Sequence, residues 1–306
     1  MRKSIVLILA VSVIMITACA SAPNPERSPE VTAEIPELFN PIDEKLVVPI
    51  KVSHPVPIDN WTIQIQPGRQ GGQGGQRPEG EQGQRVRERP EGEQGQRQAG
   101  EGQGQRRGRG PFFEQSGKGR LPSRWEWNGK STRETGEMVQ SATDYRFILT
   151  VNDKFGNAGT YEGIIGVDVL VIQDGDDLRI IVPSIVFPPN SANLNAVSED
   201  EQRSNRRVLR LIANALTKYD DYAITVEGHS NPITPPGTPE RTAEEKADEA
   251  LSQQRAQAVV SFLVDNNDIN QGRLTSIGMS CTKPVAEYDD EDENWKNRRV
   301  EFLLRK

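Results

Sequence analysis

The chain has 306 residues, a formal net charge of −7 and 34% hydrophobic residues, which suits two modest domains and argues against a nucleic-acid binder. The two histidines, His54 and His229, lie far apart, and no histidine and cysteine cluster has metal-ligand spacing. Ser230 lacks the glycine-flanked context of a hydrolase nucleophile, and Cys281 is typical of a packed thiol. We therefore predict a non-enzymatic protein that needs no metal and no cofactor.

The N-terminus predicts export. Arg2 and Lys3 precede an apolar run from Ile5 to Ile16, which is shorter than the roughly 20 residues that cross a bilayer. The Ile-Thr-Ala-Cys sequence that ends at Cys19 resembles a bacterial lipobox, so residues 1–18 are predicted to be a lipoprotein signal peptide. The alternative is a cleaved secretory signal with an incidental cysteine. Lipidation, with palmitate, would leave Cys281 as the only free thiol and exclude an internal disulfide.

Residues 19–45 are then expected to be a tether. The stretch from Ala20 to Pro41 could reach up to about 70 Å when extended, at about 3.3 Å per residue. Because alanine rather than aspartate follows Cys19, enteric sorting rules favour the outer membrane, with the body of the chain facing the periplasm.

Between residues 70 and 110 the composition changes to Gly, Gln, Arg, Glu and Pro, and residues 77–85 are repeated at 89–97. Such a sequence cannot bury a core, so we predict a disordered insertion over residues 68–119. Its arginines leave open a contact with RNA, anionic lipid headgroups or glycans. The interleaved glutamates and the export signal argue against RNA and favour a solvated spacer.

Alternating patterns flank this insertion. Trp61, Ile63 and Ile65 alternate with polar residues before it, and Trp125 alternates with Trp127 after it. A further alternation from Tyr145 to Val151 ends in a turn composition. We predict one all-β sandwich over residues 46–171, with these aromatic side chains in its core. The pattern resembles bacterial Ig-like domains related to the flagellar hook-capping protein, and such a domain could contact other envelope proteins.

The last third predicts alternating strands and helices. A connecting hairpin is expected at residues 172–182. Residues 183–306 are then predicted to form an α/β (α+β) sandwich with a small mixed sheet. Its predicted strands are 185–187, 222–227, 273–277 and 299–304, and its helices are 199–218 and 240–264.

Arg255 interrupts an apolar stripe on the second of these helices. Leu251, Val259 and Leu263 recur four residues apart, and Arg255 falls in the same line. One interpretation is structural: the arginine pairs an internal carboxylate, or its stem packs while its head reaches water. The functional interpretation is that it faces a pocket, where its planar guanidinium binds the carboxylate of a ligand through two N–H groups.

Three motifs carry a resemblance to the OmpA family, which includes Pal and MotB. They are Glu-Gly-His-Ser-Asn at 227–231, Leu-Ser-x-x-Arg-Ala-x-x-Val at 251–259 and Asn-Arg-Arg-Val-Glu-Phe at 297–302. The resemblance implies non-catalytic binding of the peptide stem of peptidoglycan. By the same resemblance, Arg255 clamps the diamino acid of the stem, and the predicted ligand-binding residues are Ser230, Asn231, Arg255, Asn297 and Arg298.

The chain departs from the family at Asn231, where the family has an aspartate that accepts from the ligand's ammonium group. An uncharged acceptor loses on the order of 1 kcal/mol, or about tenfold or less in affinity. The following stretch is longer than usual, and one of its carboxylates could replace the aspartate, although acidic residues at a helix start also suit the helix dipole. Those carboxylates are Glu240, Glu244, Glu245, Asp248 and Glu249. A stem that contains ornithine would also explain the departure.

We therefore predict an outer-membrane lipoprotein, anchored through Cys19, that tethers the membrane to peptidoglycan. The alternative is a scaffold whose OmpA-like pocket has lost peptidoglycan binding. A third interpretation is binding of a polyanion through the arginine-rich insertion. The acidic run 287–293 lacks the EF-hand pattern and is interpreted as a solvated loop rather than a calcium site.

Overall fold

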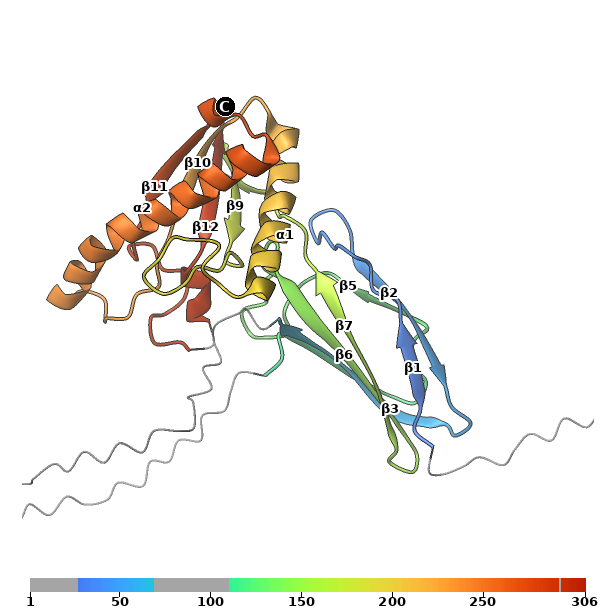
Figure 1. Ribbon diagram of the computed structural model, residues 1–306. Coiled ribbons are helices and arrows are strands. Elements are labelled where there is room, and N and C mark those ends of the chain that lie inside the picture. Colours follow the sequence, from blue (N-terminus) through green and yellow to red (C-terminus); the bar gives the residue numbers. More distant parts are fainter. Residues whose placement is uncertain (1–26, 69–109, 292) are drawn as a thin grey trace, which may run out of the picture.

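The structure is a computed structural model that describes residues 27–68, 110–291 and 293–306 (Figure 1). The predicted signal peptide, Cys19 and most of the predicted insertion lie outside these residues. Within the described ranges, no helix is both long enough and apolar enough to span a membrane.

The described residues between 30 and 170 form a unit of two small antiparallel sheets, which we call the β module. One sheet has the order β1-β2-β5 and the other β4-β3-β6-β7. The strands are β1 (Glu30–Ala33), β2 (Leu46–Ser53), β3 (Ile58–Pro67), β4 (Phe113–Lys118), β5 (Arg124–Trp127), β6 (Asp144–Asp153) and β7 (Ala158–Gly166).

Both sheets contribute to one hydrophobic core, as the alternating patterns predict. Ile63 and Ile65 of β3 and Trp125 and Trp127 of β5 are at most 3% exposed and belong to the same cluster. The two indole rings are stacked, with centroids 6.3 Å apart. The predicted burial of these aromatic side chains is therefore confirmed, whereas the likeness to Ig-like domains stays a prediction.

Two boundaries differ from those predicted. The expected tether over 19–45 already folds at β1, which pairs with β2, and Phe39 is 2% exposed in the core. The expected insertion over 68–119 is too long at its end, because β4 pairs with β3 from Phe113 to Lys118. The low-complexity composition ends at Gly110, and the apolar side chain of Phe112 supplies the burial that fixes the chain.

Residues 172–306 form a five-stranded mixed sheet in the order β11-β10-β12-β9-β8, with only the β10 and β11 pair parallel. Side chains of both long helices join a single core with one face of the sheet (Figure 1). The elements are β8 (Ile172–Asp174), β9 (Asp177–Val182), α1 (Glu199–Leu216), η1 (Thr217–Tyr219), β10 (Ala223–Gly228), α2 (Pro239–Asn267), η2 (Gln271–Arg273), β11 (Leu274–Gly278), η3 (Asn294–Asn297) and β12 (Val300–Arg305).

The predicted first strand at residues 185–187 is wrong. The predicted connecting hairpin is instead the β8-β9 edge of the sheet, since β9 pairs with β12. Pro183 follows β9 at once, and a proline has no N–H to continue the ladder. The backbone of Val186 is satisfied by the side chain of Asn205, which accepts from its N–H and donates to its carbonyl, both at 2.8 Å.

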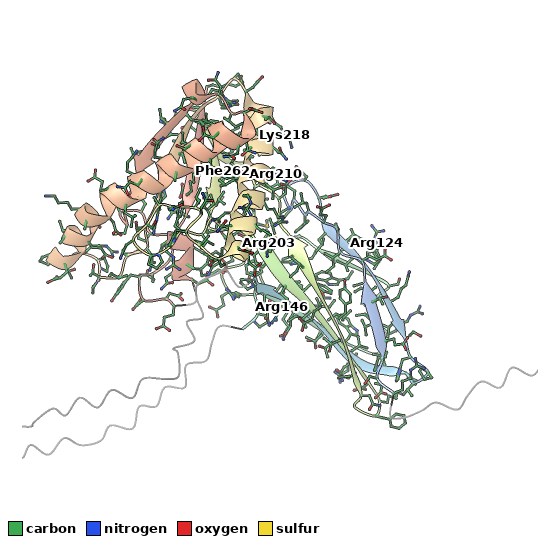
Figure 2. All side chains as sticks on the ribbon, in the orientation of Figure 1. Arg124, Arg146, Arg203, Arg210, Lys218 and Phe262 are labelled. Carbon is green, nitrogen blue, oxygen red and sulfur yellow. The ribbon has the colours of Figure 1, made fainter. Side chains whose placement is uncertain are left out.

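The ends of both long helices follow local chemistry. Ser198 and Glu201 form a capping box at the start of α1, and the hydroxyl of Thr238 caps α2, whose first residue is Pro239. Figure 2 shows the positively charged side chains Arg203 and Arg210 on α1 and Lys218 on η1, which follows it. The predicted helices at 199–218 and 240–264 are thus confirmed to within a few residues.

Candidate functional site

The loops that carry the predicted site residues gather at one end of the sheet. The backbone N–H of Ser230 donates to the carbonyl of Ser280 at 2.7 Å, and that of His229 donates to Arg299 at 2.9 Å. Helix α2 lies against the same strand ends. A Cβ added at Gly228 would lie 2.2 Å from the carbonyl oxygen of Ser252, so only glycine allows this approach.

Arg255 is half-buried on α2 and is held by a loop. Its Nε donates to the carbonyl of Ser191 at 3.1 Å and its Nη2 to that of Pro188 at 3.2 Å. The guanidinium carbon lies 5.3 Å from the centroid of the Phe187 ring. None of the described carboxylates forms an ion pair with it. The internal carboxylate partner of the structural interpretation is therefore not found, and the guanidinium keeps N–H groups that these two contacts do not use.

Asn231 and Asn297 are in direct contact. The Asn297 Nδ2 donates to the Asn231 Oδ1 at 3.0 Å and to the Ala286 carbonyl at 2.9 Å. Its Oδ1 accepts from the backbone N–H groups of Val285 and Ala286 at 2.7 and 2.9 Å. Asn297 is fully buried, so its amide links two loops of the site.

The other two predicted residues, Arg298 and Ser230, differ in their exposure to solvent. Arg298 is exposed, and its positive charge helps to lower the pKa of Arg255, for which burial is the larger cause. Ser230 is 5% exposed, and its Oγ has no hydrogen-bond partner among the described residues. Arg298 is thus accessible to a ligand, whereas Ser230 lies beneath the surface.

The five carboxylates of the long 231–251 stretch have different surroundings. Glu244 accepts hydrogen bonds from the N–H of Ile233 at 2.7 Å and of Thr234 at 3.1 Å, and Glu245 lies 3.4 Å from Arg241. These two carboxylates stabilise the loop. Asp248 is half-buried and opposes the burial effect on the pKa of Arg255. The remaining two, Glu240 and Glu249, are exposed.

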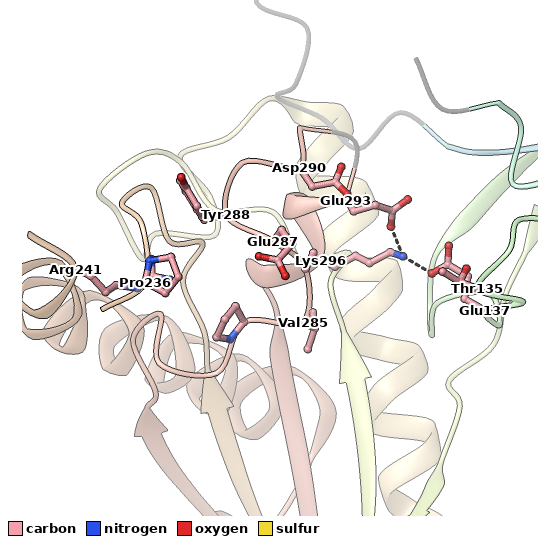
Figure 3. Close-up of a pocket in the computed structure, with 12 residues that line it drawn as sticks. Thr135, Glu137, Pro236, Arg241, Val285, Glu287, Tyr288, Asp290, Glu293 and Lys296 are labelled. Atoms are coloured by element: carbon pink, nitrogen blue, oxygen red, sulfur yellow. Dashed lines mark hydrogen bonds and ion pairs between the residues drawn. The ribbon is translucent and has the colours of Figure 1, made fainter. Parts of the chain in front are cut away.

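A pocket of about 390 Å³ lies between the β module and this end of the sheet (Figure 3). Thr135 and Glu137 line it from the β module, whereas Val285, Tyr288 and Lys296 line it from the other side. No local pattern in the sequence predicts this pocket, because the residues on its two sides lie 99 or more positions apart. Only packing brings them together.

Charged side chains are buried on β10 and β12 and partly buried on β9. Glu301 forms ion pairs with Arg179 Nη1 and Arg299 Nε, each at 2.5 Å. Glu227 forms a third ion pair with Arg179, at 3.4 Å. The ligand atoms of Glu227, His229 and Glu301 lie within 4.8 Å of one another, a spacing that could hold a metal ion. Two guanidiniums already neutralise these two carboxylates, so the residues form an ion-pair network and do not fit a cation.

This network predicts acid sensitivity. The neighbouring His229, 3.6 Å away, is the largest cause that lowers the pKa of Glu227, and Arg179 adds to it. The unfolded chain then binds a proton at this position at a higher pH than the folded chain does. The stabilisation by Glu227 should be present above about pH 4.3 and decline as the pH falls through the lowered folded value.

Urea unfolding at pH values from 7 to 3 measures this effect. The free energy of unfolding should fall more steeply with acid in the wild type than in Glu227→Gln. Equal slopes for the two proteins would contradict the assignment.

A mixed sheet covered on one face by two helices, with polar loops gathered at one end, defines an α+β domain. Residues 186–298 match the OmpA family and form an OmpA-like domain.

Two relatives are similar to part of the chain. Outer membrane porin F of Pseudomonas aeruginosa is 30% identical over 93 residues, which are 30% of this chain and 24% of that protein. Outer membrane protein Omp38 of Acinetobacter baumannii is 26% identical over 116 residues, or 38% and 28% of the two chains. The matched part thus spans about a quarter of the length of these relatives.

Among solved structures, a putative MotB-like protein from Desulfovibrio vulgaris is similar, with 22% identity and a TM-score of 0.35 over 45% of this chain and 78% of that one. The cell wall anchor of the T6SS from P. aeruginosa has 31% identity and a TM-score of 0.33, over 44% and 86%.

Proposed function

We propose that this protein is a non-enzymatic lipoprotein of the outer membrane that binds the peptide stem of peptidoglycan through its OmpA-like domain. The observation that carries the proposal is Arg255, half-buried beside Arg298 and oriented by two loop carbonyls. The envelope location is supported by the relatives, which are outer membrane proteins. Peptidoglycan and, through a lipid on Cys19, the outer membrane are the proposed partners.

The geometry suggests a division of roles at the site. Arg255 and Arg298 would receive carboxylates of the stem, because a guanidinium offers several N–H groups in one plane. Asn231 would accept a hydrogen bond through its amide oxygen, which has a second lone pair beside the one that Asn297 uses. Asp248 is our candidate for the carboxylate that faces an ammonium group of the ligand.

Co-sedimentation tests the proposal. The chain from Ala20 to Lys306, produced without a lipid anchor, is mixed with purified peptidoglycan from its host. After centrifugation, the fraction of protein in the pellet is compared with that of a control without peptidoglycan. Retention is expected. If the chain does not pellet, peptidoglycan binding is wrong. Incorporation of labelled palmitate, and its loss in Cys19→Ala, tests the anchor separately.

Asn231→Asp is expected to raise the affinity for a stem fragment that contains diaminopimelate by up to about tenfold, since a charged acceptor adds on the order of 1 kcal/mol. The carboxylate can still accept from Asn297, so the contact between the two loops should persist. Calorimetric titration with a soluble wall fragment measures the change. An unchanged affinity would contradict a role of residue 231 in receiving the ammonium group.

A scaffold function is the second candidate, and one observation favours it. The contacts of Arg255 with Pro188 and Ser191, and that of Asn231 with Asn297, are satisfied within the chain. A domain with such internal contacts could serve protein interactions without binding the wall. Failure of the wild type to pellet, together with capture of an envelope protein by the β module, would favour the scaffold.

A further inference from the structure

Four charged side chains meet where the β module contacts the OmpA-like domain. Arg133 and Glu137 come from the β module, and Glu293 and Lys296 come from the OmpA-like domain. Arg133 Nη1 lies 2.6 Å from Glu293 Oε1, and Lys296 Nζ lies 2.5 Å from Glu137 Oε2. Pairs also form within each side, between Arg133 and Glu137 and between Lys296 and Glu293. We call these four residues the junction cluster.

The junction cluster is largely shielded from water. The exposed fractions of its side chains are 18% for Arg133, 22% for Glu137, 9% for Glu293 and 13% for Lys296. Alternating charges in such surroundings attract one another more strongly than pairs on an open surface. Glu137, Glu293 and Lys296 also line the pocket in Figure 3, where Lys296 lies between the two carboxylates. The cluster therefore fixes the position of the Lys296 segment against the β module.

This segment leads directly into the candidate site. Glu293 precedes η3 and Lys296 lies within it, next to Asn297. The buried amide of Asn297 bonds the backbone of Val285 and Ala286 and the side chain of Asn231. A displacement of η3 would therefore move the loop at 285–286 and remove the support of Asn231.

We propose that the β module positions the stem-peptide site: the junction cluster holds η3, and η3 holds Asn231 through Asn297. Arg133 and Glu137 are positioning residues, because they pair with Glu293 and Lys296 and act on Asn231 through η3. The β module is then a part of the binding unit rather than a spacer. The binding readout of this inference rests on the proposed function.

The test removes both charges of the β module in the variant Arg133→Gln/Glu137→Gln, in the chain from Ala20 to Lys306. Glu293 and Lys296 keep each other as partners, so no buried charge is left alone. Hydrogen exchange of the Val285 and Ala286 amides should become at least about threefold faster. The affinity for purified peptidoglycan should fall by about two- to fivefold, the range expected for loss of partly shielded ion pairs.

Three further variants complete the design. Glu162→Gln removes an exposed β-module carboxylate that lies 3.9 Å from Arg146, and it should change neither readout. Lys296→Arg preserves the charge at the junction and should behave as the wild type, whereas Lys296→Gln should behave as the double variant. A purely structural role of the cluster would instead lower the midpoint of urea unfolding without a selective effect on the two amides.

The outcomes separate this inference from the proposed function. Unchanged exchange in the double variant overturns the inference, whether or not affinity changes, because the route through Asn297 is then absent. Faster exchange with unchanged affinity also overturns it, since the position of the loop then has no effect on binding. If the wild type does not bind peptidoglycan, the proposed function fails, and selectively faster exchange in the variant still supports the mechanical link from the β module to η3.

Discussion

Arg255→Ala is expected to lower the affinity for peptidoglycan by about 10- to 100-fold, because a hydrogen bond to a charged group contributes about 1.5–3 kcal/mol. The substitution removes the guanidinium that would receive a stem carboxylate. It also removes the two bonds that hold the loop at Pro188 and Ser191. Co-sedimentation over a range of peptidoglycan concentrations measures the loss.

Two variants distinguish the paired N–H groups of Arg255 from its positive charge, and its specific role from a general effect of removing an arginine. Arg255→Lys keeps the positive charge but cannot bind a carboxylate through two parallel N–H groups, so it should recover only part of the affinity. Arg203→Ala removes an exposed arginine of α1 and should leave binding unchanged. If Arg255→Ala pellets as well as the wild type, Arg255 is a structural arginine that holds the 188–191 loop, and the clamp is wrong.

Arg299→Ala is expected to have the largest effect on stability, a loss of about 3–5 kcal/mol in the free energy of unfolding. The Arg299 side chain is 3% exposed and pairs with Glu301 at 2.5 Å, and its Nη2 donates to the carbonyl of Lys283 at 3.0 Å. Without it, Arg179 must pair with both Glu227 and Glu301, so one negative charge of the buried network is left uncompensated. A carboxylate that is 6% exposed cannot recover the loss from water. Urea unfolding at neutral pH measures the difference.

The matched control is Arg305→Ala at the end of β12, the strand that Arg299 directly precedes. Arg305 lies 2.8 Å from Asp177, but its side chain is 59% exposed, so the loss should be no more than about 1 kcal/mol. Replacing both Arg299 and Glu301 by apolar residues of similar volume should restore part of the stability, because no unpaired charge remains. A loss below about 1 kcal/mol for Arg299→Ala would show that the buried network is not a major contributor to stability.

The local sequence determined the helices, most strands and the motifs of this protein. Helix α1 follows from a period of 3.6 residues behind a Ser198 and Glu201 cap, and β3 and β6 follow from strict alternation of apolar and polar residues. The motif around Arg255 indicates the OmpA-like domain from sequence alone, without any knowledge of tertiary contacts. These signals are local, because a helix face or a strand face is encoded within a few residues.

Contacts between distant segments required the tertiary structure. Residues 185–187 have an apolar strand pattern, but the strand that pairs with β12 is β9, which ends at Val182 just before Pro183. The side chain of Asn205 then bonds the backbone of Val186, where a neighbouring strand would otherwise pair. The junction cluster joins Arg133 to Glu293, which lie 160 positions apart and have no pattern in common. Ion pairs and buried amide contacts depend on which surfaces pack together, and that packing is set by the whole fold rather than by a neighbouring stretch of sequence.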